Sequence, residues 1–174
     1  MVVILKKLFT LLLLFTLNTY WYNLGAMQPK EVSEASFQAT KTLAYLSFKL
    51  ITQDTKQQAQ DIVRQAFDKT EVIINNSESK RQWYGAFLED RMVGVTRVWI
   101  NGRHNNLTQI EYLVVDKDFR KQKIGTAIIE FVKPMAGTGL LFLYASELAT
   151  KDFYKKCGFS QSSTFSGEMT WRKK

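Results

Sequence analysis

Two residue types that carry much of enzyme chemistry are nearly missing from this sequence. Its 174 residues include one cysteine, Cys157, and one histidine, His104. A single cysteine excludes an internal disulfide and a metal site built from several thiolates. His104 lies in the turn-like stretch 101–106, where an exposed loop histidine is expected, and no Ser/His/Asp or Cys/His pattern accompanies it. We therefore predict no bound metal and no nucleophile activated by histidine.

Acidic residues are outnumbered, and the resulting charge favours an anionic partner. Lys and Arg number 24 against 16 Asp and Glu, which gives a formal net charge of +8. Such a charge suits nucleic acid, an acidic membrane surface or a polyphosphate cofactor. The basic residues include two short groups, one of Arg120, Lys121 and Lys123 and one of Lys151, Lys155 and Lys156. Trp83 and Trp99 alternate within expected strands and are interpreted as core, so we expect no nucleic-acid partner.

The first 26 residues differ in composition from the rest. Residues 8–17 read LFTLLLLFTL after a lysine pair, and no charge follows before Pro29. Three interpretations stay open: a secretory signal cleaved after Ala26, a membrane anchor with membrane association through residues 8–26, or translation that starts at Met27. The protein would accordingly be exported, membrane-associated or cytoplasmic. We divide the chain into this segment, 1–26, a polar linker, 27–40, and one domain, 41–174.

Hydrophobic periodicity predicts an α/β domain. Apolar residues recur at helical spacing in 59–67, 124–135 and 148–157, whereas strand-forming residues dominate the segments between them. The predicted strands are 42–51, 83–88, 92–100, 108–115, 140–145, 159–163 and 168–172. The order is thus β-α-β-β-β-α-β-α-β-β, which gives an α/β layer arrangement with a mixed sheet.

The predicted strand 108–115 brings possible catalytic groups together. Strict alternation along it would place four residues on one face, namely Gln109, Glu111, Leu113 and Val115. The other face would carry Ile110, Tyr112 and Val114. A carboxylate in this position can take a proton from a substrate directly or through water, while an exposed strand glutamate is the simpler interpretation of Glu111.

The turn after this strand has the composition of an anion site. Residues 115–127 join the strand to the next predicted helix, so backbone N–H groups and the positive helix end converge there. Gly125 permits close approach of a ligand to the backbone, and Arg120, Lys121 and Lys123 add positive charge. This combination suits a pyrophosphate.

The same turn resembles the cofactor loop of the GNAT acyltransferases, Arg/Gln-x-x-Gly-x-Gly/Ala. Arg120 and Gly125 match the pattern, while Lys123 stands in place of the first glycine and Lys117 in place of a frequent proline. Residues 153–159, FYKKCGF, resemble the family's second signature, Phe-Tyr-x-Lys-x-Gly-Phe. The resemblance covers about 41–174 and implies the GNAT fold, a mixed, mostly antiparallel sheet of six to seven strands flanked by helices.

The resemblance implies acetyl-CoA as co-substrate and no metal. The pyrophosphate would be held by the loop from Arg120 to Thr126, that is by Arg120, Lys121, Gln122, Lys123, Ile124, Gly125 and Thr126. Leu113 and Val115 would offer backbone groups to pantetheine, in a gap between their strand and the next. Because Lys123 replaces a glycine, we expect an altered loop geometry, with binding retained through its backbone N–H.

Two side chains are candidates for acid–base catalysis. The resemblance assigns to Tyr154 the proton for the departing CoA thiolate, and a packed aromatic is the structural alternative. Glu111 is the candidate base for the substrate ammonium. Cys157 is interpreted as a packing residue, because the resemblance implies direct transfer without an acyl-cysteine.

The predicted function is an N-acetyltransferase that moves an acetyl group from acetyl-CoA to a primary amine by direct transfer. The acceptor would be a small amine or a protein amine, in a pocket formed by the first helix region and the hairpin 88–92. The alternative is a non-catalytic GNAT-fold binding module, membrane-tethered or exported. The apolar N-terminus and the lysine at position 123 favour that alternative.

Overall fold

The computed structural model describes residues 43–67, 72–103, 107–137, 139–163 and 166–173, which all lie in one of the two compact units of the chain, Ala35–Lys174. The predictions made for 1–26, for 27–40 and for His104 lie outside the described residues. No helix within the described ranges has the length and apolarity needed to cross a membrane.

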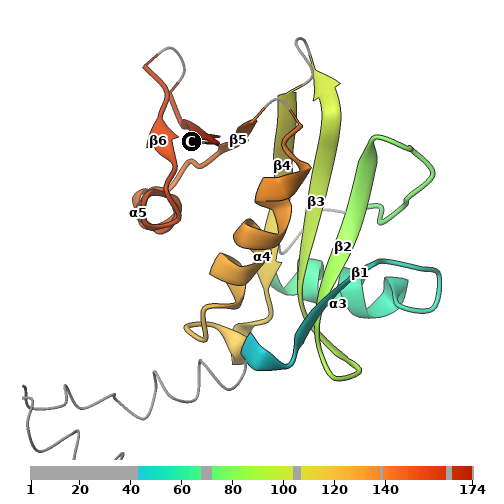
Figure 1. Ribbon diagram of the computed structural model, residues 1–174. Coiled ribbons are helices and arrows are strands. Elements are labelled where there is room, and N and C mark those ends of the chain that lie inside the picture. Colours follow the sequence, from blue (N-terminus) through green and yellow to red (C-terminus); the bar gives the residue numbers. More distant parts are fainter. Residues whose placement is uncertain (1–42, 68–71, 104–106, 138, 164–165, 174) are drawn as a thin grey trace, which may run out of the picture. The chain divides into compact units, whose positions relative to one another are not determined.

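The order of strands and helices is the predicted one (Figure 1). Two short 3-10 helices, η2 and η3, are added to it. The elements are β1 (Leu46–Leu50), α3 (Lys56–Ala66), β2 (Arg81–Leu88), β3 (Arg91–Arg103), β4 (Leu107–Val115), η2 (Lys117–Phe119), α4 (Ile124–Val132), η3 (Lys133–Met135), β5 (Leu140–Tyr144), α5 (Leu148–Lys156), β6 (Ser160–Gln161) and β7 (Glu168–Arg172).

The strands form one mixed sheet of seven strands in the order β1-β2-β3-β4-β5-β7-β6. All neighbouring strands are antiparallel except β4 and β5, which are parallel because α4 forms the crossover between them. The predicted α/β class and the mixed, mostly antiparallel sheet flanked by helices are therefore confirmed.

Several element boundaries differ from the predicted ones for local reasons. The first strand begins at Leu46, and residues 43–44 are helical instead. The helix predicted to reach Met135 ends at Val132, because Pro134 has no N–H to continue it, and a 3-10 turn follows. Phe159 follows α5 and takes part in its C-terminal cap, since its N–H donates to the Tyr154 carbonyl, and β6 is reduced to Ser160–Gln161.

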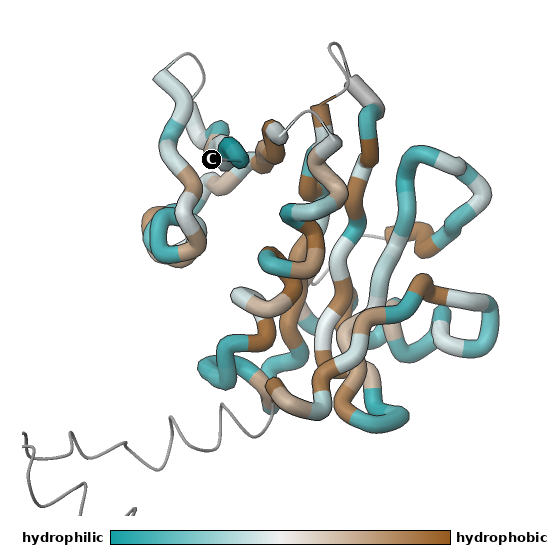
Figure 2. Tube along the Cα trace, in the orientation of Figure 1, coloured by the Kyte–Doolittle hydropathy of each residue, from teal (hydrophilic) through white to brown (hydrophobic). Residues whose placement is uncertain are grey.

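Each face of the sheet has its own hydrophobic core. One face packs against α4, which buries Ile124, Ile128, Ile129 and Val132. The other face packs against α3, which buries Ala59, Ile62 and Val63. We call them the α4 face and the α3 face. Figure 2 shows the apolar colouring concentrated on β3, β4 and the side of α4 turned toward them. The spacing of these residues along each helix explains why both helices form and how they dock.

Loss of one core side chain of α4 tests this packing. Ile128 is 1% exposed, so Ile128→Ala removes buried methyl groups and leaves a cavity. We expect the free energy of unfolding to fall by about 2 to 5 kcal/mol. Ile73→Ala is the matched control, because Ile73 is 71% exposed and its loss should change stability by less than about 0.5 kcal/mol. Equal effects in urea denaturation would contradict this docking of α4.

Candidate active site

The strands β4 and β5 part after a short stretch of pairing. Only Thr108 with Leu141 and Gln109 with Phe142 are paired between them, although β4 continues to Val115. Along the rest of β4 the pairing is with β3 alone. Figure 1 shows β5 turning away from β4. The gap that the family resemblance implies is thus present, and the β5-facing backbone groups of β4 beyond Gln109 have no strand partner there.

A β-bulge interrupts β4 at Glu111 and corrects the predicted alternation. Arg97 pairs with Tyr112, but the next residue of β3, Val98, pairs with Ile110, so Glu111 is the extra residue. Ile110, Leu113 and Val115 consequently pack on the α4 face, while Tyr112 and Val114 pack on the α3 face. The prediction that Glu111 shares a face with Leu113 and Val115 is therefore wrong, because strict alternation does not survive a bulge.

Glu111 lies on the α3 face between two arginines. Its Oε1 is 3.4 Å from Nε of Arg81, and its Oε2 is 3.2 Å from Nε of Arg97. The side chain is 16% exposed, so it is neither the freely exposed glutamate of the simpler interpretation nor an unpaired carboxylate. Neither arginine carried a signal in the sequence, because their meeting with Glu111 depends on the strand register.

The turn from β4 to α4 is built around Asp116. Its carboxylate accepts a hydrogen bond from the Asp118 N–H at 3.1 Å, and its own N–H donates to the Val93 carbonyl at 3.0 Å. These bonds begin η2 and fix the end of β4 to β3. After η2, Lys121 and Lys123 adopt positive φ angles of 64° and 62° before α4 begins at Ile124.

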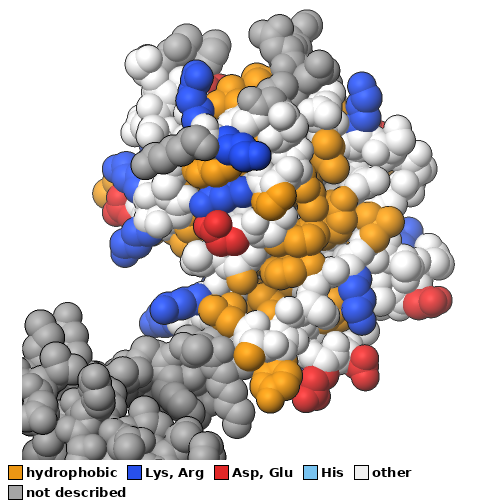
Figure 3. All heavy atoms as spheres, in the orientation of Figure 1, with side chains coloured by type: hydrophobic (Ala, Val, Ile, Leu, Met, Phe, Trp, Pro, Cys, Tyr) orange, Lys and Arg blue, Asp and Glu red, His pale blue; other side chains and the backbone are white. Residues whose placement is uncertain are grey.

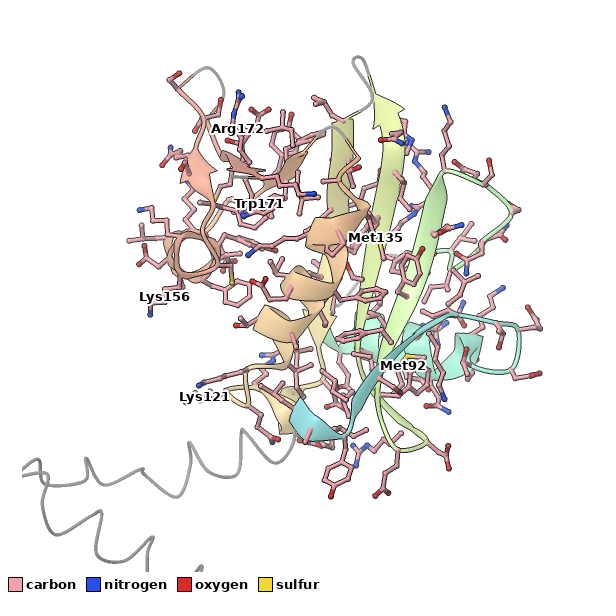
Figure 4. The ribbon with its side chains drawn as sticks, in the orientation of Figure 1. Met92, Lys121, Met135, Lys156, Trp171 and Arg172 are labelled. Carbon is pink, nitrogen blue, oxygen red and sulfur yellow. The ribbon has the colours of Figure 1, made fainter. Side chains whose placement is uncertain are left out.

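The left-handed conformation of Lys123 explains the glycine in the family pattern. Only glycine takes this conformation without steric cost, and a side chain there costs roughly 1 to 2 kcal/mol. The backbone at Lys123 therefore has a conformation that glycine favours. The lysine can occupy this position without the change in loop geometry that we expected. On the face shown in Figure 3, Lys and Arg side chains lie in several places around a hydrophobic centre. Lys121, labelled in Figure 4, projects outward from this turn.

The other predicted cofactor residues differ in what they can offer. Arg120 is exposed, and its Nε lies 3.4 Å from the Val115 carbonyl, to which it donates a hydrogen bond. Ile124 is 1% exposed and belongs to the core, so only its backbone is available to a ligand. A Cβ on Gly125 would lie 3.2 Å from the ring of Phe153, so α5 packs closely here. The remaining two, Gln122 and Thr126, are partly buried.

Arg91 ties this turn to the hairpin between β2 and β3. Its Nη2 lies 3.4 Å from Oδ2 of Asp116, which is buried, and its guanidinium carbon lies 4.5 Å from the centre of the Phe119 ring. The arginine thus clamps both ends of η2. Sequence reasoning did not identify this residue, since its partner lies 25 positions away.

Tyr154 lies in the last turn of α5 and is 7% exposed. The rings of Phe153 and Phe159 flank it, with centres 5.0 and 5.6 Å from its own. Gly158, at a φ of 87°, follows the helix as its cap. Its N–H donates to the Lys155 carbonyl, and the N–H of Phe159 donates to the Tyr154 carbonyl. Burial, and to a lesser degree Cys157, raises the pKa of Tyr154 to about 12. The hydroxyl therefore holds its proton at neutral pH.

The remaining reactive groups do not suggest another chemistry. Burial raises the pKa of the Cys157 thiol, and a hydrogen bond with the Thr126 side chain only partly offsets this, so the thiol stays protonated at neutral pH. Within the described ranges, no group of three or more His, Cys, Asp or Glu side chains is placed to hold a metal ion.

Comparison with known proteins gives a consistent result. Residues 79–161 match the family model described as "Acetyltransferase (GNAT) domain". No curated protein matches the sequence. Among solved structures, PaiA N-acetyltransferase from Thermoplasma acidophilum in complex with coenzyme A has a TM-score of 0.58 at 17% identity, over 74% of this chain and 99% of that chain.

Two further structures have similar values. A Bacillus subtilis acetyltransferase in complex with CoA has a TM-score of 0.57 at 15% identity, over 74% of this chain and 99% of that one. An aminoglycoside acetyltransferase from an uncultured soil metagenomic sample, in complex with sisomicin, has a TM-score of 0.55 at 17% identity, over 70% and 95%. These structures show that the chain has the GNAT fold, and residues 79–161 match the model of the GNAT acetyltransferase domain.

Replacement of Lys123 by glycine separates backbone strain from charge. Lys123→Gly relieves the left-handed conformation, and we expect the free energy of unfolding to rise by roughly 0.5 to 1 kcal/mol. The same change removes a positive charge beside the expected pyrophosphate, so the Kd for CoA should rise several-fold. Urea denaturation and calorimetric titration measure the two effects. Lys117→Gly, outside the left-handed positions, should not stabilise, and a stabilisation equal to that of Lys123→Gly would contradict the assignment.

Loss of the Arg91 clamp should weaken cofactor binding from a distance. Arg91→Ala frees the Asp116 carboxylate and the Phe119 ring, so the turn becomes less fixed, and we expect the Kd for CoA to rise about three- to ten-fold. Arg91 is 60% exposed, so the free energy of unfolding should change little. Arg91→Lys keeps the charge without the planar group, so its Kd for CoA should lie between those of the wild type and Arg91→Ala. An unchanged Kd in Arg91→Ala would remove Arg91 from the site.

Proposed function

We propose that this domain transfers an acetyl group from acetyl-CoA to a primary amine in a single direct step. The observation that carries the proposal is the parting of β4 and β5 directly before a basic turn at the start of α4. Unpaired backbone groups along one strand suit the amide groups of pantetheine, and a helix start with basic neighbours suits a pyrophosphate. Acetyl-CoA carries both groups in one molecule, with the pantetheine amides followed by the pyrophosphate.

The residues from Arg120 to Thr126 are proposed to hold the pyrophosphate. Arg120, Lys121 and Lys123 are exposed and bring three positive charges to the first turn of a nine-residue helix. Ile124 and Gly125 contribute backbone N–H groups, since their side-chain positions face the core and α5. Leu113 and Val115 are proposed to bond pantetheine through their backbone.

The transfer needs an acid and a base. The amine nitrogen attacks the thioester carbonyl carbon, the C–S bond breaks, and the CoA sulfur leaves with the electron pair. Tyr154 is proposed to donate its proton to this sulfur, because its hydroxyl is protonated at neutral pH. Glu111 is proposed to take the ammonium proton through water, from the α3 face of the sheet.

The non-catalytic alternative has lost part of its support. One of its two arguments was the lysine at position 123, and this residue adopts the backbone conformation that glycine would have. The other argument, the apolar N-terminus, falls on residues outside the described ranges. The same thiol-release experiment that tests the enzyme tests this alternative.

Tyr154→Phe is the sharpest test of the chemistry. Loss of the hydroxyl should lower kcat for acetyl transfer by roughly 100-fold or more, measured as release of free CoA thiol with a panel of amines. The Kd for acetyl-CoA should change less than about two-fold, because the ring remains packed between its neighbours. Tyr144→Phe is the matched control, since Tyr144 is 53% exposed and is not among the residues proposed to hold acetyl-CoA or to transfer a proton.

The pH dependence gives a second readout of the same role. Because burial raises the pKa of Tyr154 to about 12, its proton should stay available, and kcat should show no alkaline loss between pH 8 and 10 caused by this residue. An unchanged kcat in Tyr154→Phe would show that the tyrosine is not the proton donor and only packs in the core. Saturable acetyl-CoA binding without turnover of any amine would favour the non-catalytic module.

A further inference from the structure

The proposed reaction gives no role to two arginines of the α3 face. Two neighbouring strands place an arginine opposite a tryptophan twice, Arg81 opposite Trp99 and Arg97 opposite Trp83. The guanidinium carbon of Arg81 lies 4.1 Å from the Trp99 ring centre, and that of Arg97 lies 5.5 Å from the Trp83 ring centre. The aromatic rings restrict both guanidinium groups to defined positions.

Glu111 fixes the inner edge of both arginines. Each of its oxygens lies near one Nε atom, at 3.4 Å for Arg81 and 3.2 Å for Arg97, although neither contact has hydrogen-bond geometry. A guanidinium group has five N–H donors, and Glu111 addresses only the Nε edge. Glu111 therefore does not contact the terminal nitrogens of either arginine, which face outward toward Glu78.

The same face concentrates buried polar atoms without a hydrogen-bond partner. Within the described part of the chain, such side-chain atoms are Arg81 Nε, Trp83 Nε1, Arg97 Nε, Gln109 Oε1 and Glu111 Oε2. All belong to three adjacent strands, β2, β3 and β4, and to one face. The two Nε atoms and the Glu111 oxygen are held in ion pairs with one another, so this face carries a buried charged cluster whose hydrogen bonds are incomplete.

One exposed carboxylate approaches the terminal nitrogens from outside. Glu78, in the bend before β2, lies 3.3 Å from Nη1 of Arg81 and 4.0 Å from Nη2 of Arg97, and its side chain is 57% exposed. Exposed ion pairs contribute little to stability and are easily exchanged. Glu78 thus shows the charge that this pair of arginines attracts, and a ligand can replace it.

We propose that Arg81 and Arg97 form a subsite for an oxyanion of the acceptor, so that the acceptor is an amine that also carries a carboxylate or a phosphate. This inference rests on the proposed function. Planar arginine forks match both oxyanions. Glu111 lies two residues, or roughly 7 Å, along β4 from Leu113, so an acceptor of a few bonds spans the distance from the arginines to the gap beside β4.

The subsite can be tested without turnover by measuring how N-acetylated amines, which resemble the product and have no charged amine, bind to the protein in the presence of CoA. We would titrate N-acetylglycine against N-acetylglycinamide, and N-acetyl-O-phosphoethanolamine against N-acetylethanolamine, by calorimetry. The two pairs distinguish a carboxylate from a phosphate. We expect the anionic member of at least one pair to bind ten-fold or more tightly, and Arg97→Gln to abolish that preference.

Glu78→Gln keeps the test independent of folding, because Glu78 is exposed and outside the core. Removal of the competing carboxylate should strengthen binding of the anionic analogue two- to five-fold and leave the neutral analogue unchanged. Glu130→Gln is the matched control, since Glu130, on α4, is also an exposed glutamate, 58% accessible, and forms an ion pair with Lys133 of η3. Arg97→Lys replaces Arg97→Gln if the latter does not fold, and it should lose most of the preference because it lacks the fork.

The outcomes separate this inference from the proposed function. Equal binding of the members of both pairs, or a preference that the Arg97 variants and Glu78→Gln leave unchanged, overturns the subsite. Acetyl-CoA binding and thiol release with amines, measured separately, would then still support acetyl transfer. If the titrations are repeated without CoA and the anionic analogues are still preferred, while acetyl-CoA itself does not bind, the subsite stands and the transferase is overturned.

Discussion

The parting of β4 from β5 is the constraint on which the whole site depends. A sheet normally satisfies its backbone groups between neighbouring strands, and here that pairing stops after Gln109 while β4 continues to Val115. The bulge at Glu111 occurs at the same place and increases the local twist of β4. Together they leave one edge of a central strand available to a ligand, directly before the turn that begins α4.

The turn before α4 combines positive charge with an unfavourable backbone conformation. Lys121 and Lys123 both have positive φ angles, which residues other than glycine rarely adopt. Such strain is found where surrounding structure enforces it, and here Asp116, Arg91 and Phe119 fix the preceding 3-10 turn. A charged side chain in place of glycine gives up a little stability and adds an electrostatic contact to an anion, which is consistent with a site for a polyphosphate.

The two faces of the sheet divide the proposed work. Tyr154, with its raised pKa, lies in the core of the α4 face, on the side of the turn and of α5. Glu111, Arg81 and Arg97 lie on the α3 face, joined to one another and stacked on tryptophans. The proposed proton donor and the polar groups proposed for the acceptor thus lie on opposite sides of the sheet.

Local sequence determined the elements and the turn. The apolar spacing of α3 and α4, the strand segments and the cap at Gly158 are set by neighbours a few residues apart, so they could be predicted, as could the basic turn. Tyr154 became a candidate only through the resemblance to the GNAT family. The face of Glu111, its two arginines and the Arg91 clamp were decided by the tertiary structure alone. A bulge shifts the register between strands, and register follows from packing between segments far apart in the chain, which no local pattern records.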